Sequence, residues 1–481
     1  MFKSSYLRLT SSERYASLFL FFLTISVYGL ALSVMLALCV ANGRDPVSTL
    51  IIPMKDPTGY AILAQNLLTY KAFTHVPPPP FILDASRTPG YPLFLASTLF
   101  VARTPFAVPL VQMALVGLTG VLIFKVGARL FSHGVGLVAA LLYILDPAVM
   151  LLSFQYMSET LFMFLFMLFL FILLSRPIQP AIPRSLFYAG ILLGVVTLVR
   201  PITQFLPPFV LAFIFFLHKG SWKASRLYLS LGAFSLGMIL IVTPWMARNR
   251  LHAGEFQISV IGPYNLTYYV SLYLAAKYGV PFEVVRAQYQ SNITRARSVG
   301  DPSSTVEFTR QNMEYVSRGI GGDIAGYLRF HLVNTLPFLT ASSWKVPVIY
   351  YRSHVRENPL PPPSLAGYPN VLLGARLGPV IAILFQRPPE WFYGLERLAR
   401  VLLFAFAALP LWFEGRDRRI VCLFLFGLIL YFAFLTGPVS HARYRLPGEP
   451  SLFLLGLWGI EFVRRRWRGQ AGLGTPPSCL S

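Results

Sequence analysis

The sequence SLFLFFLTISVYGLALSVMLALCVA occupies residues 17–41 and contains no charged side chain. A helix needs about 20 apolar residues to cross the hydrocarbon core of a bilayer, so this run is long enough to do so. It is too long for the apolar core of a signal peptide, and no clear small-x-small cleavage site follows it. We therefore expect a retained membrane-spanning helix here.

The remainder of the chain has a similar composition. Of its 481 residues, 55% are hydrophobic and only 12% are charged, and the mean hydropathy is +0.59. A soluble protein carries about a quarter charged residues. The composition therefore indicates an all-α protein that crosses a membrane many times. The candidate spans are residues 17–41, 105–124, 134–152, 157–175, 186–200, 203–218, 227–245, 397–413, 419–436 and 450–463.

The formal net charge of +22 comes largely from basic residues in the short links between these runs. Cytoplasmic links between membrane helices are enriched in Lys and Arg. If the N-terminus is cytoplasmic, all these links and both termini lie on the cytoplasmic side, which explains the charge without a nucleic-acid partner. The basic links are Lys3/Arg8/Arg14, Lys125/Arg129, Arg176/Arg184, Lys219/Lys223/Arg226, Arg416/Arg418/Arg419 and Arg464/Arg465/Arg466/Arg468.

Two long loops face outward in this topology, residues 42–104 and residues 246–396. The second loop contains two further apolar stretches, 325–343 and 371–385. These stretches either lie on the membrane surface or form an extra pair of crossings. The sequence therefore predicts ten to twelve membrane helices and two large extracytoplasmic loops.

The chain shows no internal repeat and no region that would fold apart from the membrane. We expect one membrane domain over residues 1–470 and a short cytoplasmic tail over residues 471–481. The three cysteines form no metal-binding or disulfide spacing, because Cys39 and Cys422 lie within apolar runs and Cys479 lies in the tail. The expected location is the cell inner membrane.

The first outward loop contains the segment KDPTGYAILAQNLLTY, residues 55–70. Its apolar residues recur at three- and four-residue spacing, which predicts an amphipathic helix. Asp56 precedes Pro57, a residue favoured at the first helical position, so the dipole of the helix would keep the Asp56 carboxylate ionised. An ionised carboxylate at the membrane edge suits a general base. The alternative interpretation is a helix N-cap without a catalytic role.

The same loop ends in SRTPGYPLFLA, residues 86–96. Arg87 stands just before a Pro-Gly-Tyr-Pro turn that leads back to the membrane. An arginine there can hold a phosphate at the level of the lipid headgroups. It could equally anchor the following helix at the interface.

Together these segments resemble the first loop of the C-type (GT-C) glycosyltransferases. The nearest branch contains protein O-mannosyltransferases, aminoarabinose transferases of lipid A, and bacterial transferases that decorate lipopolysaccharide cores. The resemblance covers residues 15–465 and implies a GT-C-like helical bundle. Further motifs similar to the family's follow in order: Ser158-Glu159-Thr160-Leu161-Phe162, Leu198-Val199-Arg200-Pro201, Pro244-Trp245 with Arg248-Asn249, and His441-Ala442-Arg443-Tyr444-Arg445-Leu446-Pro447.

The resemblance implies that a sugar moves from a polyprenyl-phosphate carrier to an acceptor hydroxyl with inversion at the anomeric carbon. Asp56 would be the base and Glu159 a second acidic group of the site. A carboxylate can also offset positive charge in an oxocarbenium-like transition state. The leaving phosphate needs cations, a role implied for Arg87 and Arg248. The other substrate-binding candidates are Tyr60, Tyr91, Asn249, His441, Arg443 and Tyr444.

Several of these residues have an alternative structural interpretation. Glu159 could be an interfacial acid with a local partner, and the group around His441 could be an interfacial aromatic and basic belt. Arg200 is expected to extend its charge toward the interface. Some relatives place a metal-binding glutamate directly before the basic residue of the first loop, but this chain has Ser86 there. No cofactor or metal is therefore expected.

The leading functional hypothesis is a membrane glycosyltransferase whose partners are a lipid-phosphate sugar, a lipid, glycan or protein acceptor, and membrane lipids. A flippase or transporter of lipid-linked sugars is the first alternative, although transporters tend to show repeats and charges at the membrane midplane. A polymerase or ligase of surface polysaccharide is the second. The sequence contains no Walker-type or dinucleotide-binding motif, which suits a lipid carrier.

Overall fold

The computed structural model describes residues 11–53, 56–76, 83–174, 183–218, 224–294, 302–350, 388–439 and 441–468. Within these ranges the regular secondary structure is helical. The β-type pairing found there is one isolated antiparallel bridge between Thr74 and Leu83. The predicted all-α class is therefore confirmed.

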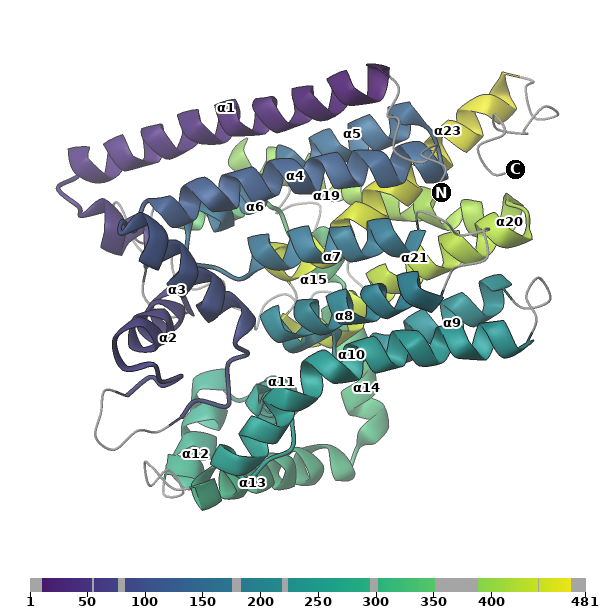
Figure 1. Ribbon diagram of the computed structural model, residues 1–481. Helices are drawn as coiled ribbons and strands as arrows, with labels where there is room; N and C mark the ends of the chain where they lie inside the picture. Colours follow the sequence, from purple (N-terminus) through teal and green to yellow (C-terminus); the bar gives the residue numbers. More distant parts are fainter. Residues whose placement is uncertain are drawn as a thin grey trace.

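The described spans form a bundle of roughly parallel and antiparallel helices (Figure 1). Every predicted span corresponds to a described helix or pair of helices. The bundle comprises α1 (Ser11–Ala41), α4 (Ala107–Leu130), α5 (His133–Ile144), α6 (Pro147–Phe154), α7 (Glu159–Leu174), α8 (Pro183–Val199), α9 (Pro207–His218), α10 (Ala224–Ala253), α19 (Pro388–Ala408), α21 (Arg416–Thr436) and α23 (Glu449–Trp467).

The remaining described helices lie in the predicted outward loops or in short connections. They are α2 (Asp56–Tyr70), α3 (Gly90–Ala102), α11 (Ile261–Tyr278), α12 (Phe282–Thr294), α13 (Pro302–Gly321), α14 (Ile324–Thr335), α15 (Pro337–Thr340), α16 (Lys345–Tyr350), α20 (Pro410–Phe413) and α22 (Ala442–Arg445). A π-helical turn spans Val47–Ile51, and 3-10 turns span Pro201–Thr203, Gly437–Val439 and Leu446–Gly448.

The lengths of the bundle helices determine how they can cross a membrane. Among the described residues, four helices are long and apolar enough to cross it: α1, α4, α10 and α21. The bent pair of α5 and α6 makes a fifth candidate, and α3, α7, α8 and α9 are shorter apolar helices. At 1.5 Å per residue, a 16-residue helix such as α7 is about 24 Å long, which is shorter than the ~30 Å hydrocarbon core.

The predicted span over residues 134–152 is formed by a bent pair of helices rather than by one straight helix. The chain bends by 53° between α5 and α6. Pro147 starts α6, and the Asp146 carboxylate accepts hydrogen bonds from the backbone N–H groups of Ala148 (2.8 Å) and Val149 (3.3 Å). A proline has no N–H to continue the preceding helix, and an aspartate before it caps a new one.

The two ends of the bundle differ. The start of α1 and the end of α23 lie at the same end, and α2 and α3 lie at the opposite end (Figure 1). His133, the first residue of α5, is 3.0 Å from Glu13 near the start of α1. The predicted basic link at Arg416 is joined to the end of α9, because Arg416 donates a hydrogen bond to the carbonyl of Phe216 (3.4 Å).

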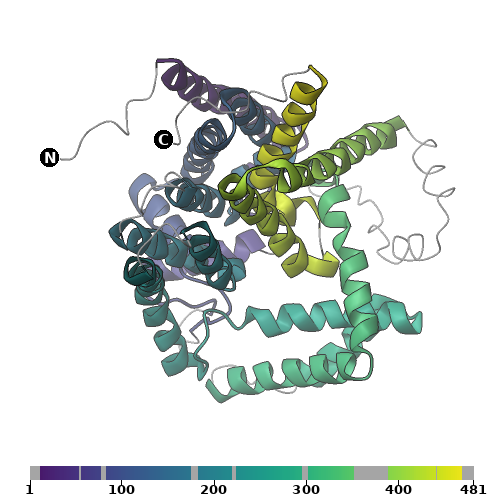
Figure 2. The ribbon, with the colours of Figure 1, turned by 90° about the vertical axis from the view of Figure 1, so that its right-hand side faces the viewer.

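The second outward loop forms a layer of its own. Helices α11–α14 lie to one side of the bundle when it is seen along its length (Figure 2). Val270 and Tyr273 of α11 pack against Val316 of α13 and Tyr327 of α14 in a separate apolar cluster. Of the two apolar stretches expected in this loop, 325–343 forms α14 and α15, and 371–385 lies outside the described residues.

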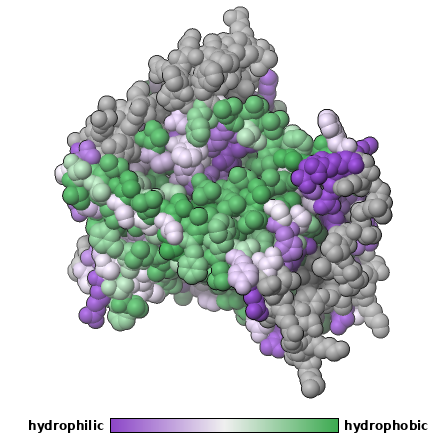
Figure 3. Space-filling view, turned by 90° about the horizontal axis from the view of Figure 1, so that it is seen from above, coloured by the Kyte–Doolittle hydropathy of each residue, from purple (hydrophilic) through white to green (hydrophobic). Residues whose placement is uncertain are grey.

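The surface of the bundle is apolar over a broad area (Figure 3). On α1 alone, Leu18, Phe19, Phe22, Leu30 and Val34 are each at least half exposed. A soluble protein seldom exposes a large contiguous apolar patch, whereas a lipid-facing helix does so along its length. The chain is therefore a multi-pass membrane protein.

Candidate functional site

The first outward loop and the start of α7 meet at a pair of tyrosines. The rings of Tyr60 in α2 and Tyr91 in α3 are 4.9 Å apart in an edge-to-face arrangement. The Tyr60 hydroxyl is hydrogen-bonded to the hydroxyl of Ser158 (3.3 Å), and the Tyr91 hydroxyl donates to the side chain of Gln112 (2.9 Å). Both rings are buried. The loop is thereby attached to the residue that directly precedes Glu159.

Asp56 is the first residue of α2, as its place before Pro57 predicts. It lies one helical turn before Tyr60, on the same face of α2. The side chain of Asp56 lies outside what the structure describes, so its role remains a prediction.

Arg87 lies beside the first turn of α2. Its guanidinium is 4.6 Å from the centre of the Tyr60 ring, a cation–π contact. A methyl group added at Gly59 would lie 3.7 Å from the Arg87 Nη2 atom. The Arg87 backbone N–H donates to the carboxylate of Asp84 (3.2 Å), which orders the turn before α3. Arg87 is therefore placed within reach of the helix N-terminus that begins with Asp56.

Glu159 is buried, with 2% of its surface exposed. Its Oε1 atom accepts hydrogen bonds from Arg200 Nη1 (2.7 Å) and from Arg443 Nε. Its Oε2 atom is buried and has no hydrogen-bond partner among the described residues. A carboxylate buried in this way must be paired with cations. The Glu159 carboxylate is therefore shared by two guanidiniums.

This pairing differs from the sequence-based expectation for two of its members. Arg200 was expected to extend toward the interface, but it is directed into the protein and pairs with Glu159. The alternative interpretation of Glu159 as an interfacial acid implied a local partner, but Arg443 is 284 residues away in sequence. Arg200 also lies 5.7 Å from the centre of the Phe162 ring, one turn along α7.

The turn that carries Arg443 is shaped by its neighbours. His441 caps α22, because its Nδ1 atom accepts a hydrogen bond from the Arg443 backbone N–H (3.2 Å). The His441 and Tyr444 rings are 4.5 Å apart. The protein packed around the imidazole and the charge of Arg443 lower the pKa of His441.

Arg248 and Asn249 form a clamp that closes the first loop onto α10. The Arg248 guanidinium donates to the carbonyl of Asp84 (2.6 Å), to that of Phe73 (3.5 Å) and to the Asn249 side chain (2.9 Å). Buried Asn249 in turn donates to the carbonyl of Gln257 (2.8 Å). Both side chains thus contact protein groups, and the substrate-binding roles that the family resemblance implies for them remain predictions.

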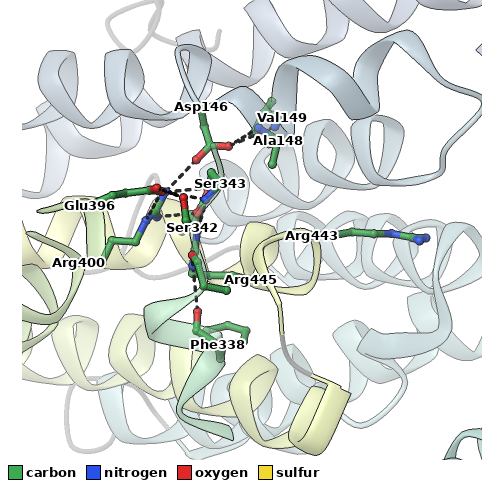
Figure 4. Close-up of polar contacts among 12 residues, drawn as sticks. Asp146, Ala148, Val149, Phe338, Ser342, Ser343, Glu396, Arg400, Arg443 and Arg445 are labelled. Atoms are coloured by element: carbon green, nitrogen blue, oxygen red, sulfur yellow. Dashed lines mark hydrogen bonds and ion pairs between the residues drawn. The ribbon is translucent and has the colours of Figure 1, made fainter. Parts of the chain in front are cut away.

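A second buried ion cluster surrounds Arg445, the last residue of α22 (Figure 4). The sequence did not predict this cluster. Arg400 of α19 pairs with Asp146 (2.9 Å), Glu396 (3.1 Å) and Glu449 (2.8 Å). Arg445 pairs with Glu449 (2.8 Å) and is completely buried. The cluster's one recognisable feature in the sequence is Asp146 directly before Pro147, a pattern typical of a helix cap. Asp146 caps α6 with one oxygen and binds Arg400 with the other.

The cluster determines how the α22 turn lies. Arg445 donates hydrogen bonds to the carbonyls of Phe338 (3.3 Å) and Ala341 (2.5 Å) and to the hydroxyl of Ser343 (2.9 Å). In the close-up view Arg443 points away from this cluster (Figure 4). The two arginines therefore hold opposite sides of one turn, Arg445 toward the core and Arg443 toward Glu159.

Replacing Arg400 with leucine is expected to destabilise the protein by about 3–5 kcal/mol, because two buried carboxylates and the partly buried Glu396 would lose their shared cation. The control is Arg318→Leu, which removes an ion pair with Glu314 from a side chain that is 77% exposed. That change should cost about 1 kcal/mol or less. Thermal unfolding of the two purified variants compares them. Equal melting temperatures would show that the buried cluster does not stabilise the fold.

The described residues do not bring three His, Cys, Asp or Glu side chains together in a group that could hold a metal. At the position where some relatives have a ligating glutamate, the Ser86 carbonyl accepts a hydrogen bond from Ser259 (2.5 Å). The independence of the site from metal remains a prediction.

Comparison with known proteins gives two similarities. Residues 86–245, about a third of the chain, match a family model described as dolichyl-phosphate-mannose-protein mannosyltransferase. The matched region includes Arg87, Tyr91, Glu159 and Arg200. No curated protein matches the chain.

Among solved structures, the archaeal oligosaccharyltransferase AglB from Archaeoglobus fulgidus, in complex with an inhibitory peptide and a dolichol-phosphate, shares 11% sequence identity with a TM-score of 0.46. The match covers 95% of this chain and 53% of that one, so the chain spans about half the length of that enzyme. This multi-pass membrane protein is thus similar to the dolichyl-phosphate-mannose-protein mannosyltransferase family over residues 86–245.

Proposed function

We propose that the protein is an inverting glycosyltransferase that moves a sugar from a polyprenyl-phosphate carrier to a hydroxyl group of an extracytoplasmic acceptor. The observation that carries this proposal is the buried Glu159 carboxylate, held by Arg200 and Arg443 and adjoining the first outward loop through the contact between Ser158 and Tyr60. The similarity of residues 86–245 to transferases that use a lipid-phosphate sugar supports it.

The charges near Glu159 suit a phosphate leaving group. Arg200 and Arg443 both bind the Glu159 carboxylate, and Arg87 adds a third guanidinium beside α2. Phosphate is bound best by guanidinium groups, which present paired N–H donors. The departing polyprenyl phosphate gains negative charge as its bond to the sugar breaks, so fixed cations stabilise the transition state more than the ground state.

The proposed reaction is a direct displacement. The acceptor oxygen forms a bond to the anomeric carbon, and the bond from that carbon to the phosphate oxygen breaks. The polyprenyl phosphate leaves with the bonding electrons, and Asp56 takes the proton of the acceptor hydroxyl. The N-terminus of α2 favours the ionised carboxylate that this step requires. Glu159 positions the arginines and helps to offset positive charge on the sugar.

Arg87 is expected to bind the carrier phosphate as a fork. Arg87→Ala should weaken donor binding by about ten- to a hundredfold, the value of a charge-assisted hydrogen bond, and Arg87→Lys should weaken it less because the charge remains. Titration of a polyprenyl-phosphate sugar into each folded variant measures this. Arg103, at the exposed end of α3, provides the control, since Arg103→Ala should bind the donor normally. Unchanged affinity in Arg87→Ala would reduce Arg87 to a membrane anchor.

We also propose that the site lies on the extracytoplasmic side of the inner membrane. The support is the distribution of Lys and Arg, which places the short links and both termini in the cytoplasm. Reporter fusions at Gly220 and Ser298 test the arrangement. A periplasmic reporter should be active at Ser298 and inactive at Gly220, and the reverse pattern would place the site in the cytoplasm.

Reconstitution into liposomes separates the proposed function from its alternatives. The purified chain is supplied with a labelled sugar on a polyprenyl-monophosphate carrier and with cell-envelope acceptors. A glycosyltransferase should move one sugar to the acceptor, a flippase should move the intact lipid between leaflets, and a polymerase or ligase should use a preassembled chain. Movement of intact lipid without transfer would contradict the proposal.

A further inference from the structure

His75, in the first outward loop, lies beside Arg87. Its Nδ1 atom is 3.4 Å from the Oδ2 atom of Asp84. Its Nε2 atom lies 3.6 Å from the position that a Cβ atom would occupy at Gly59, and the Nη2 atom of Arg87 lies 3.7 Å from the same position. Gly59 belongs to the first turn of α2, the helix that begins with Asp56. The imidazole and the guanidinium therefore face the same point on α2.

The backbone that carries His75 is held by hydrogen bonds. Buried Asn66 of α2 donates to the carbonyl of Thr74 (2.7 Å). The carbonyl of Phe73 accepts from the backbone N–H of Asp84 (2.9 Å). These contacts attach the segment both to α2 and to the turn before α3. The fold thus fixes where the imidazole lies.

The carboxylate beside His75 is bound within its own turn. The Oδ1 atom of Asp84 accepts from the backbone N–H (2.8 Å) and the hydroxyl (2.6 Å) of Ser86, and its Oδ2 atom accepts from the backbone N–H of Arg87 (3.2 Å). The Asp84 side chain is 9% exposed, whereas that of His75 is 33% exposed. A ligand beside Gly59 therefore meets the imidazole rather than the carboxylate. Because Nδ1 is next to Asp84, Nε2 is the ring nitrogen that the ligand meets.

We propose that His75 is a second ligand of the carrier phosphate, next to Arg87, a proposal that rests on the glycosyltransferase function. Two side chains that can carry a positive charge face one point, and a glycine there lets a ligand approach the backbone closely. A doubly protonated imidazole has two N–H donors, so Nδ1 donates to Asp84 while Nε2 donates to a phosphate oxygen. Hydrogen bonds between charged groups are roughly twice as strong as neutral ones. His75 and Arg87 together hold the phosphate as its bond to the sugar breaks.

Titration of a fluorescent polyprenyl monophosphate into the purified full chain in detergent tests the proposal. An asparagine amide lies near the position of Nδ1 and a glutamine amide near that of Nε2, so the two substitutions separate the contact with Asp84 from the contact with phosphate. His75→Asn should weaken binding by about tenfold, as the loss of a charge-assisted hydrogen bond implies. His75→Gln should weaken it less, because it keeps an N–H donor near the phosphate.

A matched control exists at the opposite end of the bundle. His133 also lies beside a carboxylate, that of Glu13 near the start of α1 (Figure 1). His133→Asn should bind the polyprenyl monophosphate as the wild type does. Phosphatidylglycerol vesicles serve as a competitor, and they should displace the polyprenyl monophosphate poorly.

Gly59→Ala tests the same site without altering the histidine. The added methyl group would make ordinary van der Waals contacts with His75 and Arg87, so neither has to move, but it would occupy part of the space between α2 and the phosphate. Alanine is favoured over glycine within a helix by about 1 kcal/mol. The variant should therefore be as stable as the wild type and should bind the polyprenyl monophosphate more weakly.

The outcomes separate this proposal from the proposed function. Unchanged affinity in folded His75→Asn or in folded Gly59→Ala would overturn the phosphate site and make His75 a structural partner of Asp84, and sugar transfer by the same wild-type preparation would leave the transferase standing. Equal displacement by phosphatidylglycerol would overturn the assignment to the carrier. Binding that depends on His75, without any transfer from a polyprenyl-phosphate sugar, would leave the phosphate site standing and reject the transferase. No binding by folded wild type would overturn both. Melting temperatures identify the folded variants.

Discussion

Replacing Asp56 with asparagine is expected to lower sugar transfer by about 100-fold or more, while the protein still inserts, folds and binds its lipid donor. Asparagine has nearly the size of aspartate and can still cap α2, but it cannot take a proton at neutral pH. Steady-state transfer rates, donor affinity and melting temperature should be measured on the same purified preparations. Asp56→Glu should keep a little activity, because the base is present but displaced by one methylene group.

A matched control is available in the same loop. Asp45 accepts a hydrogen bond from the Ser48 backbone N–H (2.8 Å), so it also caps a helical turn, and it is exposed. Asp45→Asn should transfer sugar at the normal rate. If Asp56 were only a cap, its Asn variant would also remain active, and replacement by Ala would cost about 1 kcal/mol of stability. Normal turnover by a folded Asp56→Asn variant would remove Asp56 from the mechanism and make Glu159 the next candidate.

Replacing Glu159 with glutamine is expected to reduce both stability and turnover. The change removes the carboxylate that the partly buried Arg200 and Arg443 share, which should destabilise the protein by about 2–3 kcal/mol, somewhat less than the loss of a fully buried ion pair. The local positive charge rises, so binding of the anionic donor should not weaken. The arginines lose their fixed positions, so kcat should fall at least tenfold, as a loss of about 1.4 kcal/mol of transition-state stabilisation implies.

A double-mutant cycle separates this role from general damage to the fold. Adding Arg443→Met to Glu159→Gln removes one of the two guanidiniums that lost their carboxylate, so it should recover part of the lost stability. The stability effects of two substitutions within one ion pair are not expected to add. Turnover should remain low, since Arg443 is proposed to stabilise the leaving phosphate. Two results together would argue instead that Glu159 binds the donor directly. The double variant would lose as much stability as the two single variants combined, and the KM for the donor would rise in Glu159→Gln.

Most of the fold could be predicted from the sequence. The length of an apolar run and the positions of Lys and Arg are local properties of the sequence. Each predicted span therefore corresponds to a helix or to a pair of helices. The boundaries were less accurate where a local group interrupts an apolar run. Asp146 and Pro147 end α5 and start α6 inside a run that is apolar on both sides. Helix α10 continues to Ala253, past the expected start of the second outward loop, because its last turns close onto the first loop.

The candidate site was harder to predict, because its contacts join distant parts of the chain. Glu159 could be recognised as an acid at the start of an apolar helix, but nothing in the sequence pairs it with Arg443. The motif of Arg248 predicts a phosphate ligand. Only the structure shows that its guanidinium donates hydrogen bonds to the carbonyls of Asp84 and Phe73. The cluster around Arg400 was missed because that residue lies in a run read only as apolar.

The central claim is a direct, inverting transfer from the lipid carrier, and the configuration of the product tests it most directly. The purified wild-type chain is supplied with a polyprenyl-phosphate sugar of known anomeric configuration, and the bond formed to the acceptor is determined by NMR. Single displacement predicts a product of opposite configuration to the donor, with none formed by Asp56→Asn above about 1% of the wild-type rate. A product that retains the donor configuration, or no transfer by folded wild-type protein, would contradict the account.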